Sequence, residues 1–226
     1  MSAVPADRVP LRIDFVSDVV CPWCAIGLAA LEQALARLPG NVDVEFHVRP
    51  FELNPQMAIE GEDISEHLQR KYGMSPEQLA EGRANIQARG KDVGFVFGDR
   101  QRTWNTFDAH RLLHWAGIAG RQLDLKRALL QAYHGDAKNV ADHATLVRIA
   151  ADVGLDAERA TAILASNEYA DVVRAEEQFF IRSGINSVPA VIIDQQHLIS
   201  GGQPVEVFER ALSEIVAGKV DGAGAD

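Results

Sequence analysis

The sequence predicts an α/β protein in which a long helical segment interrupts a small sheet. Apolar and polar residues alternate over residues 11–16 and again over residues 42–48, with the period of two that is typical of strands. Between about residue 62 and residue 184 the apolar residues follow a helical period instead, and after Gly184 the strand pattern returns. Two strand-bearing segments therefore flank a helical insertion.

The first segment is expected to form a strand, a helix and a second strand. Residues 11–16 form the first strand, and a helix opens at Pro22, where the missing N–H of a proline costs nothing. The segment 39–41, Pro-Gly-Asn, ends this helix before the second strand over residues 42–48. One face of the helix is apolar, with Cys24, Leu28, Leu31, Leu35 and Leu38. The order predicts a right-handed unit with parallel strands.

The middle segment carries the start and stop signals of successive helices. Ser75 opens a capping box with Gln78, and Pro76 between them occupies the first helical position. Gly117 and Gly154 each follow an apolar-periodic run, as helix-ending glycines do. The predicted helices cover residues 64–72, 76–90, 105–116, 122–134, 142–153, 157–166 and 168–183. Residues 93–97 carry the one competing strand signal.

The last segment predicts a hairpin and a closing helix. Residues 188–193 and 197–200 are strand-like, and the turn 194–196 separates them. The helix that follows Pro204 is expected to end at Gly218. The small, polar tail 220–226 is expected to be disordered.

Composition and charge narrow the classes of function. The chain has 226 residues, of which 47% are apolar and 24% charged, as in an ordinary globular protein. A net charge of −10 argues against nucleic acid and anionic membranes as partners, since phosphate-binding proteins usually carry a basic patch. No run approaches the ~18 apolar residues of a membrane span, and residues 1–10 lack the apolar core of a signal peptide. We expect a cytoplasmic protein.

Cys21 and Cys24 are the only cysteines, in the motif Cys-Pro-Trp-Cys. One such pair is too small for a structural disulfide framework. A structural zinc site needs four ligands, so His110 and His114 would have to complete it, and no Glu follows the first histidine as in zinc-binding helices. The pair is therefore predicted to be redox-active, with no metal, and both histidines to be surface or partly buried residues.

The position of the pair assigns a role to each thiol. Cys21 falls at the N-terminal cap of the first helix, where free N–H groups and the helix dipole favour a thiolate, so Cys21 is the predicted nucleophile. Cys24 lies one turn further on the apolar face and is the predicted resolving thiol. Pro22 and Trp23 between them are expected to tune the redox potential, and Trp23 to face substrate.

The order of elements resembles the thioredoxin fold, and the long helical insertion resembles its DsbA-like branch. The segments 49–55 (Arg-Pro-Phe-Glu-Leu-Asn-Pro), 106–112 (Thr-Phe-Asp-Ala-His-Arg-Leu) and 199–204 (Ile-Ser-Gly-Gly-Gln-Pro) look like the FrnE-type subfamily. This resemblance runs from Leu11 to about Ala217. It implies a split thioredoxin-like domain, residues 1–61 and 185–226, around a helical insertion domain, residues 62–184, that covers the active-site side.

The resemblance also implies the activity of a protein dithiol-disulfide oxidoreductase or isomerase. It makes the Val188–Pro189 bond cis and turns the Val188 backbone toward the reactive sulfur, so both residues join Pro22 and Trp23 as expected substrate-binding residues. The partners would be protein or small-molecule thiols and disulfides. No cofactor beyond the cysteine pair is implied, glutathione is one option as reductant, and the oligomeric state stays open, a homodimer included.

Two other classes of function compete with this interpretation. The kappa-class glutathione transferases and the 2-hydroxychromene-2-carboxylate isomerases share the split domain, but they carry a serine where Cys21 stands. The second alternative is a binding module or holdase in which the cysteines form a redox switch. The presence of both cysteines favours dithiol chemistry.

Further predictions concern individual residues and short segments. Asp18 is interpreted equally as a proton relay and as a turn former. Trp104, Trp115 and residues 179–181 are predicted to lie in the core. The pair Glu176-Glu177 is predicted to lie on a solvated helix face.

Overall fold

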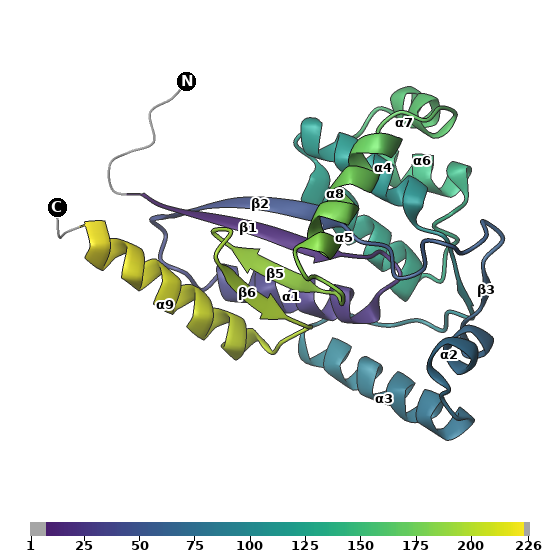
Figure 1. Ribbon diagram of the computed structural model, residues 1–226, viewed down its shortest axis with the longest axis horizontal. Helices are drawn as coiled ribbons and strands as arrows, with labels where there is room; N and C mark the ends of the chain where they lie inside the picture. The colour runs from purple at the N-terminus through teal and green to yellow at the C-terminus, as the bar shows by residue number, and fades with distance from the viewer. Residues whose placement is uncertain (1–7, 224–226) are drawn as a thin grey trace.

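A four-stranded mixed sheet forms the centre of the protein, whose computed structural model describes residues 8–223. The strands lie in the order β2-β1-β5-β6 (Figure 1). Strand β1 (Val9–Ser17) pairs in parallel with β2 (Val42–Pro50) and antiparallel with β5 (Ala190–Ile193), which pairs with β6 (His197–Ser200). The predicted α/β architecture is thus confirmed, with the first and last segments of the chain meeting at the β1–β5 pair.

Two helices from the same two segments cover one face of this sheet. Helix α1 (Pro22–Leu35) packs beside α9 (Val205–Ala223), and both lie on the same side of the strands in Figure 1. Between these helices and the sheet lies an apolar core that includes Ile13, Phe15, Leu31, Ile193 and Phe208. Because Cys24 belongs to this core, α1 is held firmly where the cysteine pair begins.

The helical insertion follows β2. It contains α2 (Ile64–Tyr72), α3 (Pro76–Asp92), α4 (Phe107–Ile118), α5 (Gln122–Leu130), the π-helix η1 (Gln131–Gly135), α6 (His143–Asp152), α7 (Ala157–Leu164) and α8 (Ala170–Arg182). Helices α4 to α8 gather at one end of the sheet, whereas α2 and α3 lie apart from them (Figure 1). Helices α4 to α7 have a core of their own, which also takes in Val19 and Val20 from the loop before Cys21.

Several local predictions were wrong. Strands β3 (Glu62–Asp63) and β4 (Arg102–Thr103) form a small ribbon that the pattern missed, because two residues cannot show an alternation. Residues 93–97 form no strand, since the backbone turns at Gly94 with φ +74° after α3 ends. The predicted helix 122–134 is divided into α5 and η1.

The last helix also differs from its prediction. Helix α9 runs through Gly218 to Ala223, so residues 220–223, predicted to be disordered, are helical, and residues 224–226 lie outside the described residues. Within residues 8–223, no helix is both long and apolar enough for a membrane crossing.

Helix α8 and its neighbours correct the predictions for the core. Phe180 is buried, but Phe179 and Ile181 are 58% and 56% exposed, because α8 offers a single face to the protein. Glu177, predicted to be solvated, is buried beside Arg174. Trp115 is buried as predicted, and Trp104 is partly buried.

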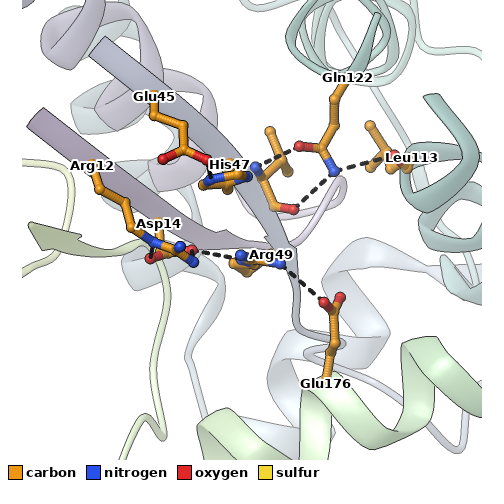
Figure 2. Close-up of polar contacts among 9 residues, drawn as sticks. Arg12, Asp14, Glu45, His47, Arg49, Leu113, Gln122 and Glu176 are labelled. Carbon is orange, nitrogen blue, oxygen red and sulfur yellow. Dashed lines mark hydrogen bonds and ion pairs between the residues drawn. The ribbon is translucent and has the colours of Figure 1, made fainter. Parts of the chain in front are cut away.

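The outer edge of the sheet is attached to the insertion by one side chain. Strand β2 is an edge strand, and the Gln122 amide bonds to both backbone groups of Val48 as a further strand would (Figure 2). Gln122 Oε1 accepts from the Val48 N–H at 2.9 Å, and its Nε2 donates to Val48 O at 3.1 Å and to Leu113 O at 3.2 Å. The first turn of α5 is thereby set against the sheet.

An ion-pair network makes a second attachment. The buried carboxylate of Asp14 accepts from Arg12 at 2.8 Å and from Arg49 at 2.6 Å, and Arg49 also reaches Glu176 of α8 at 2.9 Å (Figure 2). Burial raises the pKa of Asp14, but the two arginines outweigh it, and the pKa is lowered. Helices α5 and α8 are therefore both fixed to β2, which pairs with β1, the strand that leads to the cysteine loop.

Candidate active site

The cysteine pair lies at the start of α1. Cys21 is the N-cap residue, with φ −82° and ψ 114°, and its side chain makes no capping bond to the helix, so the sulfur stands at the end where backbone N–H groups are free. Pro22 occupies the first turn as predicted, and the Cys24 N–H donates to Cys21 O at 3.1 Å. Both residues are free thiols, Cys21 3% exposed and Cys24 fully buried.

The loop before β5 approaches the first sulfur. The Cys21 thiol lies 3.5 Å from Val188 O, and the Val188–Pro189 bond is cis, as the family resemblance implied. A Cβ on Gly27 of α1 would lie 3.0 Å from the Pro189 ring, so glycine at that position permits the close approach. The structure therefore brings Cys21, Val188 and Pro189 together from segments far apart in the chain.

A cavity of about 610 Å³ opens beside Cys21. Four of the predicted site residues line it, namely Cys21, Pro22, Trp23 and Val188. Cys24 and Pro189 do not line it. Most of the remaining wall comes from the insertion, through α2, α3 and residues 97–103. The insertion thus covers the side of the sheet that carries the cysteines, as the resemblance implied.

A buried Asp18–His110 pair lies among the elements that surround the cysteines. The Asp18 carboxylate accepts from the Leu53 N–H at 2.8 Å and lies 3.4 Å from His110 Nε2. Burial raises the pKa of Asp18, but bonds from His110, Leu53 and Thr106 outweigh it, so the pKa is lowered and the group stays charged. The prediction of a surface or partly buried His110 was wrong, because Asp18 supplies a partner inside the fold. His114, one turn later, lies against the ring of Tyr169 instead.

Lys126 was missed by the sequence analysis. Its side chain on α5 is fully buried, and its ammonium has no hydrogen-bond partner among residues 8–223. Its charge acts on Cys24, Asp18 and Cys21, while burial lowers the pKa of the lysine. The spacing offered a signal, because Leu129 and Leu130 follow three and four positions later on the same buried face.

The surroundings of Cys24 favour the protonated form of its thiol. Burial raises the pKa of Cys24 well above its ordinary value, and the hydrogen bond to Cys21 and the charge on that sulfur raise it further. Lys126 acts in the opposite direction. Cys24 is therefore a protonated thiol near neutral pH, and the positive charge that opposes this shift belongs to Lys126 of the insertion.

The π-helix η1 supports the loop that precedes Cys21. His134 is buried, and its Nε2 lies 3.0 Å from Val19 O, so the ring donates there. Burial lowers the pKa of His134 well below its ordinary value, which keeps the ring neutral. The ring also meets Phe97 and Tyr133 edge-on, at 5.5 and 4.7 Å between centroids. A π-helix, an element that is frequent at functional sites, therefore supports the loop that leads to Cys21.

Two further buried carboxylates share one arginine behind Asp18. Arg174 bonds to Glu52 and, at 2.9 Å, to Glu177. Burial, followed by the charge of Glu177, raises the pKa of Glu52 to about 7, although His110 and Arg174 oppose this. Glu52 therefore changes its charge near neutral pH.

Comparison with known proteins gives a consistent set of matches. The model of the DSBA-like thioredoxin domain family matches residues 12–213. The uncharacterized protein YwbO of Bacillus subtilis is 27% identical over 207 residues, which cover 90% of this chain and 96% of that protein. A crystal structure named "probable DsbA oxidoreductase" from Streptomyces coelicolor is 39% identical, with a TM-score of 0.86 over 92% of this chain and 90% of its own.

Two more distant structures share the fold. A cytosolic disulfide reductase, DsbM from Pseudomonas aeruginosa, solved with GSH, is 16% identical, with a TM-score of 0.62 over 91% of this chain and 99% of its own. A 2-hydroxychromene-2-carboxylate isomerase is 14% identical, with a TM-score of 0.70 over 93% of this chain and 98% of its own.

Glu52 leads to a prediction about pH. Its folded-state pKa of about 7 exceeds that of an unfolded glutamate, about 4.3. Between these values the folded protein holds a proton that the unfolded chain has lost, so stability falls as pH rises from about 4.3 to about 7. Glu52→Gln should remove this loss, on the order of 1 to 3 kcal/mol at pH 8. Urea unfolding of both proteins between pH 5 and pH 8 measures it.

Glu158→Gln, at an exposed position of α7, is the control. The difference in unfolding free energy between this variant and the wild type should stay within about 0.5 kcal/mol at each pH. A difference between wild type and Glu52→Gln that is equally independent of pH would contradict the role given to Glu52.

Proposed function

The chain belongs to the DSBA-like thioredoxin domain family, and from this premise we propose that it is a thiol–disulfide oxidoreductase that works through Cys21 and Cys24. The observation that carries the proposal is the placement of two free thiols at one helix start, where Cys21 lines a cavity and Cys24 is enclosed in the core. Dithiol chemistry needs such a pair, because one thiol attacks the substrate disulfide and the other then attacks the mixed disulfide.

In the first step the Cys21 thiolate attacks a substrate disulfide in the cavity. The substrate S–S bond breaks, a bond forms between Cys21 and one substrate sulfur, and the other substrate sulfur leaves as a thiolate that takes a proton. Backbone N–H groups without helical partners lie at the start of α1, where Cys21 is the N-cap residue, and can donate to a negative sulfur. Val188 O, 3.5 Å from the Cys21 sulfur, places a backbone acceptor where an extended substrate could pair with it.

In the second step Cys24 attacks the Cys21 sulfur. The mixed disulfide breaks, the second substrate thiol leaves, and the protein holds a Cys21–Cys24 disulfide. Cys24 must first lose its proton, although its pKa is raised well above its ordinary value by burial. Lys126 is the positive group that opposes this shift, so we assign it the stabilisation of the Cys24 thiolate. The step runs in reverse when a reductant restores the dithiol.

Pro22, Trp23, Val188 and Pro189 are proposed to hold the substrate beside Cys21. Three of them line the cavity, and Pro189 positions Val188. The proposed reductant is a small thiol such as glutathione, and the proposed location is the cytoplasm. The fold shared with a cytosolic disulfide reductase supports both.

The alternatives predict other behaviour. An isomerase of the 2-hydroxychromene-2-carboxylate type shares this fold. Such enzymes are expected to carry a serine where Cys21 stands, whereas this chain has both Cys21 and Cys24. A holdase would keep its anti-aggregation activity without either thiol. Reduction of insulin by the wild type, and its loss when both cysteines become serine, would separate dithiol chemistry from both alternatives.

The first prediction from this mechanism concerns a trapped intermediate. Cys24→Ala leaves Cys21 able to attack but removes the thiol that releases the product, so mixed disulfides with cellular thiols should accumulate on Cys21. Purification without reductant, after acid quenching and alkylation, should show reducible adducts by mass spectrometry. The variant with both cysteines changed to Ala should show none. Adducts absent from Cys24→Ala, or equally abundant in both variants, would refute Cys21 as nucleophile.

The second prediction concerns Lys126. In a reaction with Ellman's reagent, Cys21 releases one thionitrobenzoate and Cys24 then releases a second. Lys126→Met should slow the second release roughly tenfold near neutral pH, which corresponds to one unit of Cys24 pKa. The first release should change less, because Cys21 also has the helix terminus. Removal of an unpartnered buried charge should leave the unfolding free energy unchanged or raise it.

Lys91→Met, at an exposed position of α3, removes the same charge and should leave both phases unchanged. A second release as fast in Lys126→Met as in the wild type would contradict the role given to the lysine. A slow second release would contradict it too if the unfolding free energy in urea had also fallen, because the loss of stability would then explain the rate.

A further inference from the structure

Arg100 stands in the wall of the cavity beside Cys21. It is partly buried, and its guanidinium lies over the ring of Tyr133, 5.2 Å from the centroid. Among residues 8–223 no carboxylate or carbonyl bonds to it. Removing a guanidinium from water without such a partner costs free energy. An arginine in this situation is available to a group that enters the cavity.

The other charged groups around the cavity do not neutralise Arg100. Arg83 and Asp99 also line it, but they pair with each other at 3.5 Å. His67 lines it as well, and its Nδ1 is 2.6 Å from Glu62. The charge of Arg100 is thus the uncompensated one, and it acts on Cys21 as well. The cavity therefore presents a free positive group close to the proposed nucleophile.

The rest of the cavity wall limits which ligands Arg100 can bind. Apolar side chains from α2, α3 and the segment that follows, such as Leu68, Ile86 and Phe97, line the cavity. A volume of about 610 Å³ lies within the range of about 300 to 1,000 Å³ typical of small-molecule sites. The arrangement suits a compact molecule with an apolar body and one anionic end.

We infer that the cavity binds a low-molecular-weight disulfide that carries a carboxylate, and that Arg100 anchors this carboxylate while Cys21 attacks the sulfur. The inference rests on the proposed function and names its substrate class. Arginine suits the role because its planar fork binds a carboxylate through two parallel hydrogen bonds. The protein as a whole carries a charge of −10 and repels anions, so the selectivity must come from the cavity itself.

The reaction is balanced without a further reagent. Reduced protein and one small disulfide give oxidised protein and two small thiols. Cys21 and Cys24 lose two electrons and two protons, which the two sulfurs of the substrate gain. In the reverse direction, two molecules of the acidic thiol reduce the Cys21–Cys24 disulfide.

Three small disulfides of equal chain length test the inference. Dithiodipropionate is anionic, hydroxyethyl disulfide neutral and cystamine cationic. The second-order rate of oxidation of the reduced protein by each is divided by the rate of the same disulfide with 2-mercaptoethanol, at about 0.15 M salt to screen distant charges. The wild type should prefer the anion over the neutral disulfide, and Arg100→Met should lower this ratio roughly tenfold, the worth of one hydrogen bond to a charged group. Arg100→Lys should restore part of it.

Arg210→Met, at an exposed position of α9, removes the same charge away from the cavity and should keep the wild-type ratio. An Arg100→Met protein that reacts more slowly with all three disulfides by one factor would assign Arg100 to the Cys21 thiolate and overturn the anchor. An unchanged ratio would overturn it too. A wild type that reacts with all three but shows no preference defeats this inference alone, whereas a wild type that reacts with none defeats the proposed function as well.

Discussion

Complete burial of the Cys24 sulfur is the constraint on which the rest of the site depends. A buried thiol can attack only after it loses its proton, and the negative charge that results has no water to stabilise it. The structure places the positive charge of Lys126 within electrostatic range of Cys24. The negative charge of Asp18 nearby has His110 as its partner. Cys21 avoids the problem, because the start of α1 offers it free N–H groups and the cavity offers it access.

The helical insertion supplies several of the side chains that surround the cysteine pair. Strand β1, helix α1 and the loop before β5 bring together Cys21, Cys24 and Val188, but Lys126, His134 and most of the remaining cavity wall belong to the insertion. Its placement must therefore be accurate. The Gln122 amide fixes α5 to β2, and Arg49 joins Glu176 of α8 to Asp14 of β1, the strand that leads to the cysteine loop (Figure 2). The attachment of the insertion is in this sense part of the site.

Local patterns predicted the elements well and the buried charges poorly. The alternation over residues 11–16, the helix start at Pro22 and the cysteine spacing are local signals, and each element formed where it was expected. His110 and Asp18 are 92 residues apart, so no local pattern relates them. Lysines mostly lie on the surface, and only the fold shows that Lys126 is buried within electrostatic range of Cys24. The prediction that Phe179 lies in the core was wrong, since apolar character alone does not say which face of a helix is covered.

In the proposed mechanism Cys21 and Cys24 form one two-electron redox couple. Equilibration of the protein with glutathione buffers of graded ratio, followed by acid quenching, alkylation and mass spectrometry, measures it most directly. A two-electron couple should show one transition between a doubly alkylated dithiol and an unalkylated intramolecular disulfide. The ratio of dithiol to disulfide should change tenfold for each ~30 mV of buffer potential. Proteins that remain doubly alkylated at every ratio, or that collect only glutathione adducts without a Cys21–Cys24 disulfide, would contradict it.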